Sequence, residues 1–154
     1  DRVYGSVNFG DYKFHLIDTG GIELGSEDFN KEIRVQAELA IDEADVIVFV
    51  VDGKEGLTSN DLLVRDILRK YEKKVIVAIN KVDLPESNVE KVKQELMKYE
   101  LVPEAWGGTT IYVPISAKKR EGIEDLLEMV LPKKHKYTPV YAVFAMIKEE
   151  LGIY

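Results

Sequence analysis

Five apolar runs alternate with segments of helical periodicity, and this alternation constrains the fold more than any other feature of the sequence. The runs, rich in β-branched residues, are 12–17, 46–51, 75–79, 111–115 and 139–145. Between them, apolar residues recur three or four positions apart, as on one face of a helix, within 33–44, 63–71, 89–99 and 123–130. Continuous apolar runs are typical of strands buried on both faces. We therefore predict a three-layer α/β fold, an open and mostly parallel sheet with helices on both faces.

The composition excludes several classes of function. The chain has 154 residues, 21 Lys and Arg against 28 Asp and Glu for a formal net charge of −7, and no cysteine. This length suits a single domain, 1–154, with a core that needs no disulfide or thiolate-bound metal. The acidic balance disfavours contact with DNA phosphates, so DNA is not expected as a partner. No apolar run reaches the roughly 18–20 residues of a membrane span, and the first residues lack a signal-peptide pattern, so we expect a cytoplasmic domain without a membrane partner.

One shift in composition divides the last part of the chain. Pro132 is followed by a basic run, Lys133 to Lys136, which we interpret as part of a solvated linker, 132–138. The linker leads to a C-terminal unit, 139–154, predicted as a strand over 139–145 and a short helix over 146–153.

Three short motifs follow predicted strands, at the edge where open α/β sheets bind ligands. They are Asp18-Thr19-Gly20-Gly21, Asn80-Lys81-Val82-Asp83 and Ser116-Ala117-Lys118. Each alone has an ordinary structural explanation as a turn or a helix cap. Together, in this order and at these strand ends, they resemble the DxxG, NKxD and SAK motifs in the G domains of P-loop GTPases. The resemblance implies a P-loop GTPase-like fold and a site for GDP or GTP with Mg²⁺.

Asp83 has the most specific chemistry of the motif residues. Guanine presents its N1–H and its exocyclic amine as adjacent donors, and one carboxylate accepts both, whereas adenine places an acceptor at N1. The resemblance further implies that Asn80 holds the guanine edge and the loop. It also implies that the stems of Lys81 and Lys118 sandwich the ring.

The remaining motif residues complete the expected site. The resemblance places Ser116 in the base-binding set and implies that the Ala117 N–H reaches the guanine O6. On the phosphate side, it implies that Asp18 holds Mg²⁺ through water and that the Gly21 N–H donates to a γ-phosphate.

The resemblance is sharper when the chain is taken in two pieces. Residues 1–83 resemble the first G domain of the Der (EngA) family of bacterial ribosome-assembly GTPases, through LIDTGGIE and QAELAIDEADVIVFVVDGKEGLT. Residues 84–131 resemble bacterial translation initiation factor two, through LVPEAWGGTTIYVPISAKKREGIEDLLEMVL. A join near Pro85 predicts a recombined or engineered, chimeric chain. By the same resemblance, the ribosome or its RNA is an expected partner.

The phosphate-binding loop of the family, GxxxxGK[ST], does not occur in the 154 residues, and Ile22 stands where many GTPases have a water-orienting glutamine. In the family, that loop cradles the phosphates. A guanine ring alone, about 11 heavy atoms at roughly 0.3–0.5 kcal/mol each, gives millimolar affinity at best. We therefore expect weak or no GTP or GDP binding, no efficient hydrolysis and no catalytic residue. Two alternatives stay open: a GTPase fragment whose P-loop lies outside this chain, and an engineered or chimeric α/β scaffold with no ligand.

Without the P-loop unit, the sheet of the family lacks the strand between those that correspond to 12–17 and 46–51. About five apolar side chains, at roughly 1.5–3 kcal/mol each, would lose their burial in such a gap. The run 139–145 is the best candidate to fill it. A helix over 122–131 returns the chain to the amino edge of the sheet, and the linker then feeds a parallel strand. We therefore predict a circularly permuted G domain.

Overall fold

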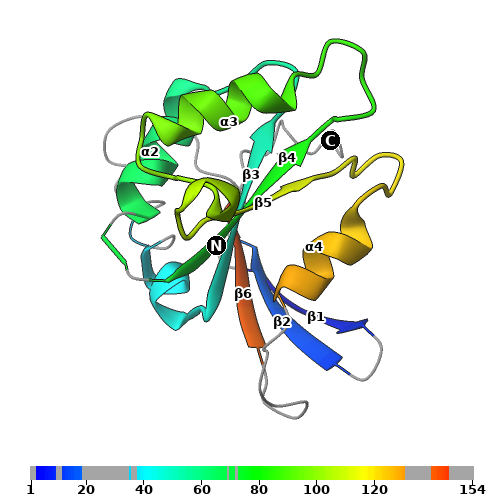
Figure 1. The fold of residues 1–154 in the computed structure, drawn as a ribbon. Helices are drawn as coiled ribbons and strands as arrows, with labels where there is room; N and C mark the ends of the chain where they lie inside the picture. Colours follow the sequence, from blue (N-terminus) through cyan, green and yellow to red (C-terminus); the bar gives the residue numbers. More distant parts are fainter. Residues whose placement is uncertain are drawn as a thin grey trace.

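Within the described residues, six strands form one sheet, and helices cover it on both sides (Figure 1). The computed structural model describes residues 3–9, 12–18, 35, 38–68, 70–71, 73–130 and 140–145. The strands are β1 (Val3–Phe9), β2 (Tyr12–Asp18), β3 (Val46–Asp52), β4 (Lys74–Asn80), β5 (Ile111–Pro114) and β6 (Val140–Ala145). Their order across the sheet is β1-β2-β6-β3-β4-β5. Every pairing is parallel except that of β1 with β2, so the mostly parallel sheet is confirmed.

The last described strand of the sequence lies in the middle of the sheet. β6 pairs in parallel with β2, where Asp18 stands opposite Phe144, and in parallel with β3, where Val48 stands opposite the same residue. The prediction of a parallel central strand between 12–17 and 46–51 is therefore confirmed for 140–145, whereas residue 139 lies outside the described residues. The expected linker, 132–138, and the expected last helix, 146–153, lie outside the described residues.

The edge strand β1 is an element that the sequence analysis missed. It pairs antiparallel with β2, with Phe9 opposite Tyr12 at the hairpin end and Val3 opposite Asp18 at the other. Only the second half of its sequence, Ser6 to Phe9, alternates polar with apolar residues. Such a short alternation is a weaker signal than the continuous apolar runs that predict strands buried on both faces.

Except for the 3₁₀ turn η1, the described helices match the predicted periodic segments. They are α2 (Ser59–Leu68), α3 (Val89–Met97), α4 (Ile123–Val130), the 3₁₀ turn η1 (Glu104–Trp106) and the helical residues 38–43. α3 begins after Asn88, whose side chain accepts a hydrogen bond from the Lys91 N–H. α2 is capped by Thr58 and Asp61, which bond to each other's backbone N–H groups. In the described part of the chain, no helix combines the length and apolar character that crossing a membrane requires.

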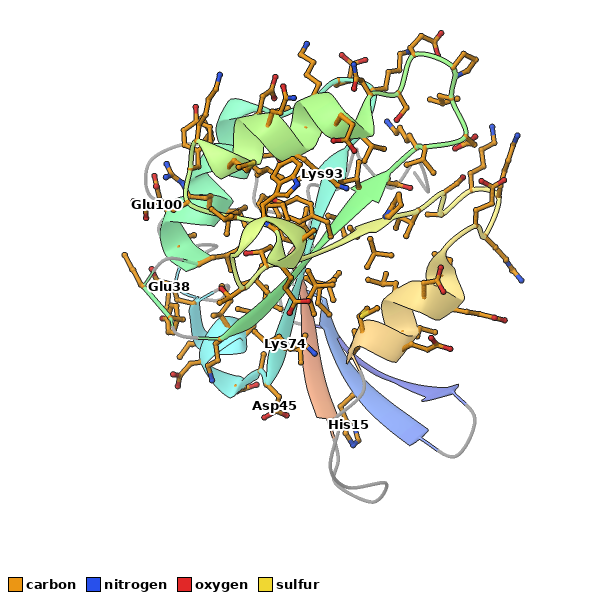
Figure 2. All side chains as sticks on the ribbon, in the orientation of Figure 1. His15, Glu38, Asp45, Lys74, Lys93 and Glu100 are labelled. Carbon is orange, nitrogen blue, oxygen red and sulfur yellow. The ribbon has the colours of Figure 1, made fainter. Side chains whose placement is uncertain are left out.

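Two apolar cores lie on opposite faces of the sheet and share β3, which is buried along its whole length. Residues 47, 49 and 51 pack toward α2, α3 and the helical residues 38–43. Residues 46, 48 and 50 pack toward α4. At the amino edge, Lys74 of β4 donates to the Met129 carbonyl of α4 at 2.7 Å (Figure 2). The predicted three-layer arrangement is thus confirmed, and it brings the carboxyl ends of β3, β4 and β5 to one edge.

Candidate functional site

The loops that follow β3, β4 and β5 enclose a cavity of about 350 Å³ at the carboxyl edge of the sheet. It is lined by Lys54, Glu55, Asn80, Lys81, Asp83, Leu84, Ser116 and Lys118. The structure therefore brings together the second and third predicted motifs, and only Ala117 of their six predicted residues does not line the cavity. Lys54 and Glu55, which follow β3, are residues that the sequence analysis did not assign to the site.

Asn80 holds the three loops together. Its side chain is buried, and its Oδ1 accepts a hydrogen bond from the Ala117 N–H at 3.0 Å. Its backbone carbonyl accepts from the Gly53 N–H at 2.9 Å. Asn80 thus links the residues after β3 and β5, and its predicted contact with the guanine edge stays a prediction. The expected contact of the Ala117 N–H with a guanine O6 stays a prediction.

Because Gly53 has no side chain, the loop after β3 can lie close to Asn80 and Ser87. A Cβ atom at this position would lie 2.7 Å from the Asn80 carbonyl oxygen and 2.6 Å from the Ser87 Oγ. The Gly53 carbonyl also accepts from the Asn88 N–H at 2.9 Å, at the start of α3. A side chain at this position would push the β3 loop away from both neighbours.

Ser116 orients the carboxylate of Asp83. The Ser116 Oγ accepts from the Lys119 N–H at 3.2 Å, so its own proton remains for another acceptor. The hydrogen bond from Ser116 lowers the pKa of Asp83, although partial desolvation raises it, and the nearby charges of Lys119 and Lys118 lower it further. Asp83 is therefore ionised at neutral pH and acts only as an acceptor.

The ammonium of Lys81 forms an ion pair with Asp52, the last residue of β3. The Lys81 Nζ lies 2.6 Å from the Asp52 Oδ2, and 5% of the Asp52 side chain is exposed. The Asp52 Oδ1 accepts from the N–H groups of Lys54 and Glu55 at 2.8 and 3.1 Å. Burial raises the pKa of Asp52, but the hydrogen bonds from Lys81 and from the two backbone groups outweigh it, so the pKa is lowered. The sequence analysis missed this ion pair.

The phosphate side of the expected site is less complete. Asp18 is the last residue of β2, but its side chain and Gly21 lie outside the described part of the structure. Their expected contacts with Mg²⁺ and a γ-phosphate therefore stay predictions. Among the described residues, no group of three or more His, Asp or Glu side chains is placed to hold a metal ion.

Sequence comparison matches this chain to G domains. The family model of the elongation factor Tu GTP binding domain matches residues 4–135. The GTPase Der of Leuconostoc citreum (strain KM20) is 45% identical over 131 residues, which cover 85% of this chain and 28% of Der. Because that match is longer than residues 1–83, the expected change of family near Pro85 is not confirmed. The chain spans little more than a quarter of the length of this relative.

Structure comparison gives the same picture. Era in complex with MgGDPNP and nucleotides 1506–1542 of 16S ribosomal RNA has a TM-score of 0.71 and 29% identity, over 90% of this chain and 47% of Era. A variant of Era from Aquifex aeolicus, bound to GDP and AlF4⁻, has a TM-score of 0.68 and 27% identity, over 90% of this chain and 46% of that one.

Proposed function

This chain belongs to the family of the elongation factor Tu GTP binding domain, and on that premise we propose that the cavity after β3, β4 and β5 binds the guanine base of GDP or GTP. The observation that carries the proposal is that Asp83 and Ser116 line one cavity with Lys81 and Lys118. The hydrogen bond from Ser116, which lowers the pKa of Asp83, supports it. The cavity volume of about 350 Å³ lies in the range of small-molecule sites.

Asp83 provides the selectivity for guanine over adenine. An ionised carboxylate accepts from both the N1–H and the exocyclic amine of guanine, and it repels the N1 lone pair of adenine. Lys81 and Lys118 line the same cavity, and their aliphatic stems offer apolar surface to the two faces of a flat base. Asn80, through its bond to Ala117, sets the distance between the loops.

The affinity that we propose is low. The 154 residues contain no GxxxxGK[ST] sequence, so this chain supplies base contacts without a phosphate cradle. Contacts to the base alone, at roughly 3–5 kcal/mol, give millimolar binding and no efficient hydrolysis. The alternative, a nucleotide site completed by a P-loop outside these residues, is supported by the fact that the chain spans 28% of its relative Der.

We also propose that this chain is a circularly permuted G domain that acts in the cytoplasm. The central position of β6, which is the last described strand in the sequence, supports the permutation. Ribosomal RNA is the proposed macromolecular partner. The bound RNA in the Era structure supports this, as does the exposed basic run from Lys118 to Arg120.

The test is calorimetric titration of the chain with GMP, GDP and AMP in the presence of Mg²⁺. We expect millimolar binding of GMP with a preference of at least about tenfold over AMP, a ratio of the size of one hydrogen bond to a charged group. Asp83→Asn should remove that preference, whereas Asp125→Asn, an exposed carboxylate on α4, should leave it unchanged.

Four results would contradict this proposal. Equal binding of GMP and AMP, or an Asp83→Asn variant with unchanged preference, would remove the assigned role of Asp83. Submicromolar GDP binding would favour a complete nucleotide site. No binding at millimolar concentrations would favour a scaffold without a ligand.

A further inference from the structure

The carboxylate of Asp52 has no part in the proposed contacts with a base, yet it is the most tightly held acid beside the cavity. It accepts hydrogen bonds from the Lys81 Nζ and from the N–H groups of Lys54 and Glu55. Two of these bonds shape the turn after β3. The third bond, with the Lys81 Nζ, joins β3 to the loop after β4 and fixes the side chain of Lys81, which lines the cavity.

Lys81 is held in an unusual position by this contact. Its φ is 65°, in the left-handed region that residues with a side chain rarely adopt. Its ammonium lies against Asp52, and 30% of its side chain is exposed. Lys81 thus lines the cavity while its ammonium is paired with Asp52, at the end of β3.

The same cavity contains the carboxylate of Asp83. If Lys81 lost its ion pair with Asp52, its ammonium would be attracted to that carboxylate. Asp83 stands two positions from Lys81 and lines the cavity with it. Other charges that act on Asp83 are those of Lys118 and Lys119, from the loop after β5. An unrestrained ammonium beside an ionised carboxylate forms an ion pair, and that pair would compete with the two donors of a guanine base.

We propose that Asp52 is a positioning residue that keeps the Lys81 ammonium away from Asp83, and so leaves the Asp83 carboxylate available to read a base. The inference rests on the proposed function of the cavity for its consequence, but not for its geometry. Asp52 affects specificity without contacting the ligand. Its ion pair with Lys81 leaves the aliphatic stem of Lys81, and not its ammonium, to face the base.

The test uses three variants of the full chain: Asp52→Asn, Lys81→Met and the double variant. Asn at 52 retains an oxygen for the N–H groups of Lys54 and Glu55 but has no charge to hold the ammonium. Met at 81 retains an apolar stem without the charge. We expect Asp52→Asn to lower the GMP preference over AMP about tenfold, and the double variant to restore it. A purely structural role of Asp52 predicts no such rescue.

A second measurement needs no ligand. The pKa of Asp83, followed by NMR of its side-chain carboxyl, should fall further by about one unit in Asp52→Asn and return in the double variant. Lys81→Met alone should leave it unchanged, which keeps the proposal testable if Asp52→Asn fails to fold. An Asp83 pKa that does not move in Asp52→Asn, or that rises in Lys81→Met, would overturn the proposal. A chain that binds no GMP contradicts the proposed function alone, because the Asp83 pKa still decides this inference.

Discussion

The bond between Asn80 and Ala117 is the contact whose removal should do most damage to the site. In Asn80→Ala, the Ala117 N–H loses its acceptor at 3.0 Å, and a side chain that is 2% exposed is deleted. An unsatisfied N–H costs about 1–3 kcal/mol, and the vacated volume adds about 1 kcal/mol. The variant should lose about 2–4 kcal/mol of an unfolding free energy of roughly 5–15 kcal/mol.

Urea unfolding followed by far-UV circular dichroism measures this loss. With a slope of about 2 kcal/mol per molar urea, the midpoint should fall by about 1–2 M. The matched control is Asn88→Ala, because Asn88 is exposed and caps α3 with one bond to Lys91. Loss of such a cap costs about 1 kcal/mol, or about 0.5 M in the midpoint. A midpoint shift in Asn80→Ala no larger than that of Asn88→Ala would refute the reasoning.

Three further predictions test the surroundings of the site. Gly53→Ala should cost about 1–3 kcal/mol in urea unfolding, because its Cβ would lie 2.7 Å from the Asn80 carbonyl oxygen; an unchanged midpoint would contradict the close packing. The lowered pKa of Asp52 means that its stabilisation is complete above its unfolded-state pKa and is lost as pH falls through the folded-state pKa. Asp52→Asn should therefore show less loss of stability than the parent chain below about pH 5, and parallel acid profiles would count against it. Tyr112→Phe should cost about 0.5–1.5 kcal/mol in thermal unfolding, since Tyr112 donates to the Leu101 carbonyl at 2.5 Å; no loss would show that water replaces the hydroxyl.

Most of the sheet could be predicted from the sequence because its strands are buried on both faces. β3 and β4 were predicted within one residue of their bounds, since an apolar run with helical segments on either side has few other places in a fold. The central place of β6 followed from the cost of an empty slot. β1 was missed because a short alternation of polar and apolar residues is a weaker signal than a continuous apolar run.

The sequence predicted which loops form the site, but it could not predict the contacts between them. Asn80 ends β4, and Asp83 and Ser116 follow β4 and β5, so their common edge follows from the parallel order. The pair between Asp52 and Lys81 depends on the register of two strands, which sets Asp52 opposite Asn80. The sequence signal for this pair was Asp52 itself, an acidic residue at the end of a fully buried strand. Such a residue needs a partner, but the sequence does not say which lysine supplies it.

The most direct test of the proposal that Asp83 reads the base is an exchange of base preference. Xanthine keeps the N1–H donor of guanine but has a carbonyl oxygen in place of the exocyclic amine, and an asparagine side chain offers one acceptor and one donor to match. We predict that the chain binds GMP more tightly than XMP in an NMR titration, and that Asp83→Asn binds XMP more tightly than GMP. The same order of preference in both proteins would contradict the account.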